Sequence, residues 1–149
     1  MPPVNWLSMV IAMLIPMLLG FVYYHKALFG NVWMKSLGLT EEDIQKGNMG
    51  MIFGVSLVCA FLIAFFIAGN VNGPGQEGVD REFDTFQHGA LHGVLMGIFL
   101  ITPIFITNGL FERKNWTNML INAGYWIICL AVMGGLLDAM NHWPNELAP

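Results

Sequence analysis

The sequence predicts an all-α membrane protein in which four transmembrane helices form one compact bundle. Of its 149 residues, 56% are hydrophobic and only 11% are charged, whereas a soluble domain carries about 25% charged residues. The hydrophobic residues also gather in four long runs, and each run approaches the ~20 residues that cross a bilayer core. We therefore expect a single transmembrane domain that comprises residues 1–149.

The four predicted spans cover about residues 5–25, 49–69, 88–111 and 118–140. The first and second spans are interrupted only by Ser8 and Ser56, whereas the third and fourth carry several polar side chains. The connection over residues 112–117 is short, so the last two helices should form an antiparallel hairpin. Pro16 and Pro103 lie inside spans and predict kinks.

The connection between the first two spans predicts a short helix in the membrane interface. Leu28, Val32 and Trp33 recur at helical spacing there, which is typical of an amphipathic interfacial segment. Thr40 precedes three acidic residues and can cap a further helical turn. By contrast, residues 70–87 are rich in glycine and acids and predict an exposed loop.

Small residues at four-residue spacing predict close helix packing in every span. Such residues let backbones approach within a membrane, where van der Waals contact drives association. The alternative is that some of these stripes face a second copy of the chain in a homo-oligomer. The stripes are Ser8, Ala12, Pro16 and Gly20; Ser56, Ala60, Ala64 and Ala68; Gly89, Gly93 and Gly97; and Ala131, Gly135 and Ala139.

The loop charges predict the orientation of the bundle. Of the six basic residues, five fall in the first and third loops and only Arg81 falls in the second. The positive-inside rule places the first and third loops in the cytoplasm, so both termini face the other side. The scattered charges form no basic patch, which excludes nucleic acid as a predicted partner.

Three histidines and one aspartate form a candidate metal site at the outer end. His88 and His92 lie one helical turn apart, and Asp138 and His142 share the same spacing on the fourth span. If the last two helices are neighbours, this ligand set suits zinc or another divalent metal. The alternative interpretation is structural: histidines at an interface also bond to headgroups, water or loop carbonyls.

A second polar cluster is predicted near the cytoplasmic end. Polar groups at this depth usually face the bundle interior, because lipid cannot satisfy them. The favoured interpretation is that Asn108 and Asn122 bond across helices and fix their register; the alternative is a small polar pocket with Glu112 as its acid. The cluster comprises Tyr23, Tyr24, Asn108, Glu112, Asn122, Tyr125 and Trp126.

Several motifs resemble the domain-of-unknown-function 1761 family of small bacterial membrane proteins. The resemblance extends over nearly the whole chain and implies four membrane helices, without implying an activity. We expect a multi-pass location in the bacterial cytoplasmic (inner) membrane. It also implies that the cytoplasmic cluster is shared by the family and that the His-Gly-Ala-Leu-His-Gly motif belongs to a subgroup. The matching motifs are Asn5-Trp6, Tyr23-Tyr24, Leu28-Phe29-Gly30, Trp33-Met34, Gly38-Leu39-Thr40-Glu41-Glu42, Leu110-Phe111-Glu112 and Ile121-Asn122-Ala123-Gly124-Tyr125-Trp126.

Three functions follow as hypotheses. The sequence has no nucleophile elbow, phosphate-binding loop, His-Glu-x-x-His motif or catalytic triad. The first hypothesis is therefore a non-enzymatic accessory subunit or homo-oligomer, whose partners are the lipid bilayer and other membrane proteins. The second is a metal- or small-molecule-binding protein that uses the outer cluster. The third is a lipid- or quinone-handling protein that uses the cytoplasmic cluster.

Overall fold

The computed structural model describes residues 4–71 and 84–141, and these form helices without strands. Four helical segments are long and apolar enough to cross a membrane, so the predicted fold class is confirmed. The elements are α1 (Trp6–Tyr23), α2 (Gly30–Leu37), α3 (Glu41–Gln45), α4 (Met49–Val71), α5 (Phe86–Met96), the π-helix η1 (Gly97–Ile101), α6 (Thr102–Phe111) and α7 (Trp116–Met140).

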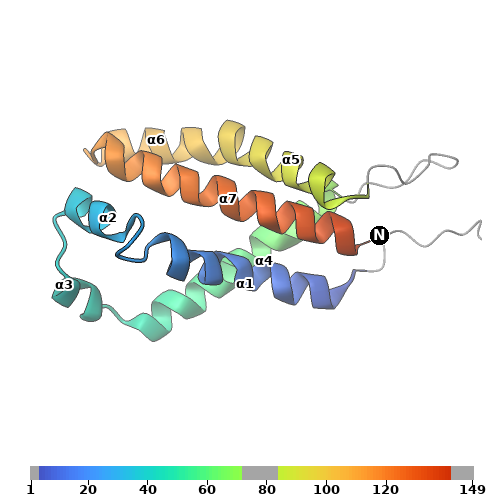
Figure 1. Ribbon diagram of the computed structural model, residues 1–149, viewed down its shortest axis with the longest axis horizontal. Helices are drawn as coiled ribbons and strands as arrows, with labels where there is room; N and C mark the ends of the chain where they lie inside the picture. Colours follow the sequence, from blue (N-terminus) through green and yellow to red (C-terminus); the bar gives the residue numbers. More distant parts are fainter. Residues whose placement is uncertain (1–3, 72–83, 142–149) are drawn as a thin grey trace, which may run out of the picture.

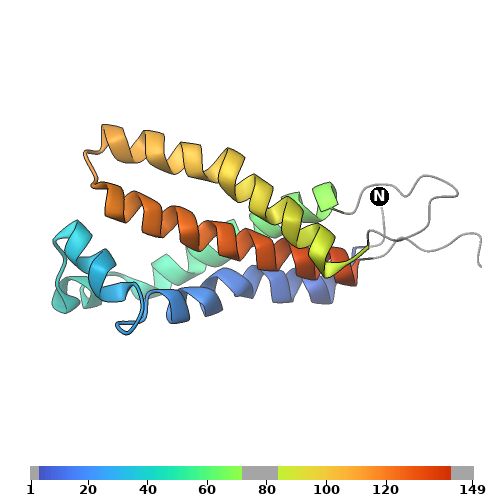
Figure 2. The same ribbon diagram turned by 45° about the horizontal axis from the view of Figure 1, so that its top comes forward.

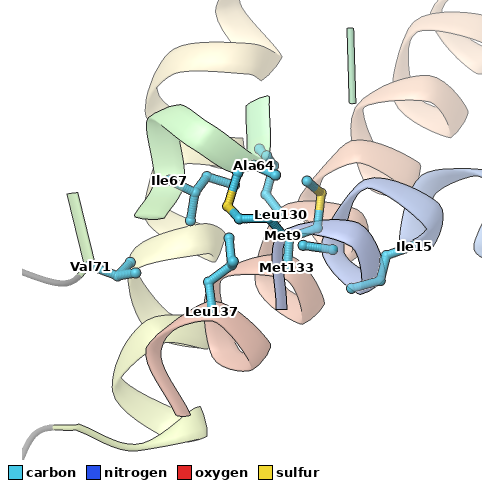
Figure 3. Close-up of a cluster of buried hydrophobic side chains, with 9 residues drawn as sticks. Met9, Ile15, Ala64, Ile67, Val71, Leu130, Met133 and Leu137 are labelled. Atoms are coloured by element: carbon cyan, nitrogen blue, oxygen red, sulfur yellow. The ribbon is translucent and has the colours of Figure 1, made fainter. Parts of the chain in front are cut away.

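Helix α7 is the most buried of the four spans, and α1, α4 and α5 all pack against it. Figure 1 shows the long helices side by side, with α2, α3 and the α6–α7 connection gathered at one end. The hydrophobic core lies where α1, α4 and α7 meet, as Figure 3 shows. Its buried residues are Met9, Ala12, Ile15, Ala64, Ile67, Val71, Leu130, Met133 and Leu137.

Glycines bring the backbones of α5 and α7 into direct contact. A Cβ atom on Gly89 would meet the carbonyl oxygen of Gly134, and one on Gly93 would meet that of Leu130. The predicted packing role of the α5 glycines is therefore confirmed. Among the α7 glycines, Gly134, outside the predicted stripe, contacts the α5 backbone, whereas Gly135 of the stripe faces the Phe86 ring.

The third span changes helical geometry before Pro103. Both the backbone N–H and the hydroxyl of Thr102 donate to the carbonyl oxygen of Gly97, with the hydroxyl at 2.8 Å. Residues 97–101 consequently form a π-helix, which inserts one extra residue into the turn. Beyond it, α6 diverges from α7, whereas α5 packs closely on α7 (Figure 2). The departure from regular α-helix therefore begins at Gly97, before the predicted kink at Pro103.

The connection between α1 and α4 contains the predicted short helix, α2, followed by α3. Helix α2 ends at Gly38, whose φ of 68° suits glycine, and packs against α7. Thr40 caps α3 in a capping box with Asp43, which confirms the predicted cap. The hydrogen bonds from Thr40 hold the pKa of Asp43 below its ordinary value.

Candidate functional site

A chain of side-chain hydrogen bonds joins α1, α7 and α2 at the end of the bundle that holds the first and third loops. The Tyr24 hydroxyl donates to Asn122 Oδ1 at 2.8 Å, and Asn122 Nδ2 donates to Asn118 Oδ1 at 3.2 Å. Asn118 Nδ2 in turn donates to Ser36 Oγ at 3.2 Å. A tyrosine phenol is protonated at neutral pH, so the Tyr24 hydroxyl acts as the donor.

Aromatic rings pack around this hydrogen-bonded chain. The Tyr125 ring lies 5.6 Å from that of Tyr23 and 5.1 Å from that of Tyr24, measured between centroids. The Tyr23 hydroxyl donates to the Ile121 carbonyl at 3.1 Å, and Trp126 packs edge-on against Tyr125. These contacts hold the end of α1 against α7. For the tyrosines and Trp126 of the predicted cluster, they favour the structural interpretation.

The other two predicted residues are Asn108 on α6 and Glu112 directly after it, and both line a pocket of about 120 Å³. The pocket lies between α6 and α7, where the two helices diverge. Asn122 also lines it, but the amide of Asn122 bonds to Tyr24 and Asn118 rather than to Asn108. Its lining residues are Phe105, Asn108, Gly109, Glu112, Lys114, Asn118, Met119 and Asn122.

This pocket combines paired charges with unused hydrogen-bonding groups. Glu112 forms an ion pair with Lys114, so the two charges compensate each other. The amide of Asn108 makes no hydrogen bond within the described part of the chain; this residue is exposed at the protein surface and lines the pocket. A carboxamide offers two donors and an acceptor. The pocket can therefore recognise a polar group that both donates and accepts.

An apolar groove of about 220 Å³ lies nearer the middle of the bundle. Ile101 lines this groove, and Phe105, one helical turn further along the third span, lines the polar pocket. Residues of α4, the π-helix region and α7 make up the groove, namely Leu62, Ile63, Phe66, Met96, Leu100, Ile101 and Leu130.

At the opposite end, three of the four predicted metal ligands come together. Asp138 is fully buried, and its Oδ2 lies 2.8 Å from His88 Nδ1. The Nε2 atoms of His88 and His92 lie 3.1 Å apart. Among residues 4–71 and 84–141, however, no set of three or more His, Cys, Asp or Glu side chains surrounds a common point. The fourth predicted ligand, His142, lies outside the described residues.

The sequence did not predict several of the hydrogen bonds that the structure shows. Ser36 receives the Asn118 amide, and its hydroxyl donates to the Trp33 carbonyl at 2.6 Å. At the other end, Asn141 Nδ2 donates to Ser8 Oγ at 2.7 Å, and the Asn5 amide N–H donates to Asn141 Oδ1 at 2.9 Å. Short polar residues beside the ends of apolar runs are the only sequence signal for such contacts.

Comparisons with known proteins agree with the resemblance in the motifs. No curated protein and no solved structure matches the chain. The DUF1761 family, described as proteins of unknown function, matches residues 7–137. That match includes nearly all of the four spans and every residue that lines the polar pocket. The chain therefore belongs to the DUF1761 family of proteins of unknown function.

Proposed function

We propose that the protein binds the polar head of a membrane amphiphile, a lipid or a quinone, in the pocket between α6 and α7. The observation that carries this proposal is the pocket itself. Polar side chains of two diverging membrane helices line it, and they include an amide without a hydrogen-bond partner among the described residues. Polar groups on membrane helices usually mark a ligand site or a helix contact.

The lining chemistry favours an uncharged or zwitterionic head that carries carbonyl or hydroxyl groups. Asn108, Asn118 and Asn122 present carboxamides, which both donate and accept hydrogen bonds. Glu112 and Lys114 neutralise each other, so the pocket has no net charge with which to select an ion. A single carboxylate without a paired base is also a poor catalytic set. The pocket therefore suits binding rather than a reaction.

The size of the pocket limits what it encloses. A volume of about 120 Å³ is well below the roughly 300–1,000 Å³ of sites that enclose a drug-sized ligand. Only a head group fits, and the apolar remainder of the ligand must lie against the helix surfaces or in the bilayer. The groove that begins one turn away at Ile101 offers an apolar surface for such a chain. Under the positive-inside rule, the head would face the cytoplasmic leaflet of the bacterial inner membrane.

Bound amphiphiles in purified protein test the proposal. The protein is extracted in mild detergent, and co-purifying lipids and quinones are identified by mass spectrometry of organic extracts. We expect one amphiphile class at near one molecule per chain, reduced at least several-fold in Asn108→Ala combined with Glu112→Gln. Asn70→Ala is the matched control, because Asn70 is an exposed asparagine on α4 whose amide bonds only to its own helix. Equal retention by the double variant and wild type would refute the proposal.

The accessory or homo-oligomeric role remains a prediction. Its sequence support came from the small-residue stripes. Gly89, Gly93 and Gly134 pack against each other's helices within one chain, so they give no support for an interface between copies. Mass measurement of the detergent-extracted protein would test this role independently of ligand binding.

A further inference from the structure

We propose that His88 and His92 form a binding site for a zinc-like divalent cation at the end of the bundle opposite the polar pocket, with Asp138 as the residue that orients His88. This site is separate from the proposed amphiphile pocket. It is built by the N-terminal part of α5 and the C-terminal part of α7, which pack closely through their glycines.

The two imidazoles converge in a geometry that suits a shared metal. Their Nε2 atoms lie 3.1 Å apart, and the rings meet at an interplanar angle of 70°. Zinc–nitrogen bonds of about 2.0–2.1 Å at a tetrahedral angle place two nitrogens about 3.3–3.4 Å apart. A ring rotation that separates the two nitrogens by a few tenths of an ångström would therefore admit the ion. The His88 side chain is 31% exposed, which leaves a route for the ion to enter.

Asp138 sets which nitrogen of His88 faces the ion. Its Oδ2 lies 2.8 Å from Nδ1. An ionised carboxylate can only accept, so with Asp138 ionised Nδ1 carries the proton and Nε2 presents its lone pair toward His92. Metal-bound histidines commonly donate their other N–H to a carboxylate in this way. The predicted role of Asp138 as a direct ligand thus becomes a positioning role.

The second oxygen of Asp138 leaves this carboxylate incompletely compensated by the protein groups that the structure describes. Asp138 Oδ1 is buried without a hydrogen-bond partner among the described residues. An unsatisfied buried carboxylate oxygen is costly, and a nearby cation offsets that cost. A divalent ion held by His88 Nε2 would lie just beyond the ring that Asp138 contacts. Water would complete its coordination, which suits a borderline cation that accepts nitrogen and oxygen donors.

Zinc titration of the metal-stripped protein in detergent tests this site. The background carries Cys59→Ser, because Cys59 is an exposed free thiol and thiolates are zinc ligands that would complicate the titration. Competition with a chromophoric chelator should show one zinc ion per chain, and zinc-edge X-ray absorption should show two imidazole ligands. His92→Ala, which leaves the Asp138–His88 contact intact, should weaken binding at least tenfold. Asp138→Asn should weaken it about 10–100-fold, the range seen when such outer partners are removed.

The matched control is His25→Ala, which removes an exposed histidine at the opposite end of the chain and should leave zinc affinity unchanged. Thermal unfolding of each metal-free variant would establish that it is folded before titration. Equal zinc affinity in wild type and His92→Ala would overturn the proposal, and so would an absorption spectrum without imidazole ligands. Loss of zinc binding with unchanged amphiphile content would support the metal site and separate it from the proposed function.

Discussion

Replacement of Gly93 by alanine should separate α5 from α7. A Cβ atom at this position would contact the Leu130 carbonyl and lie 2.7 Å from the amide nitrogen of Ala131. These are backbone atoms, so no side-chain rotation relieves the overlap. Restoring an ordinary contact of 3.4 Å to the Ala131 nitrogen alone requires about 0.7 Å of local separation, and the Leu130 carbonyl, which would lie closer, requires more. A gap of about 0.5–1 Å already forfeits about a quarter to a half of the dispersion attraction between facing atoms.

Gly54→Ala is the matched control for this substitution. Gly54 is an exposed glycine in α4, and an added Cβ would meet nothing within 4 Å. Both substitutions gain about 1 kcal/mol in helix propensity, so their difference isolates the overlap. Because overpacking typically costs about 1–3 kcal/mol, Gly93→Ala should be less stable than Gly54→Ala by that amount. Unfolding by sodium dodecyl sulfate in mixed micelles, followed by circular dichroism, measures the difference. Equal midpoints for the two variants would refute close backbone packing at Gly93.

Two further predictions concern hydrogen bonds at the ends of the bundle. Tyr24→Phe keeps the ring but removes the donor to Asn122 and should reduce the free energy of unfolding by about 0.5–1.5 kcal/mol in the same assay; an unchanged midpoint would contradict the observed bond. Asn141→Ala leaves Ser8 and the Asn5 backbone without their partners. It should cost about 1–3 kcal/mol and increase amide hydrogen exchange at the start of α1, whereas uniform exchange across the chain would count against a local contact.

Composition and periodicity were sufficient to predict the number, type and approximate bounds of the membrane helices. A run of about 20 apolar residues has few stable arrangements other than a membrane span. The four helices, the short α2 and the Thr40 cap all depend on local residue order, and the structure confirms them. The orientation of the termini, the inner-membrane location and the roles of the site residues stay predictions.

The sequence could not show which polar residues meet, because that depends on the crossing of helices distant in the chain. Asn122 was expected to bond to Asn108, yet the π-helix before Pro103 lets α6 diverge, and Asn122 bonds to Tyr24 and Asn118 instead. The resulting gap is the polar pocket. Likewise, close packing of α5 on α7 brings Asp138 against His88, although 50 residues separate them along the chain. Residue order therefore specified the four helices, whereas the divergence and close approach of neighbouring helices decided where a ligand or an ion could bind.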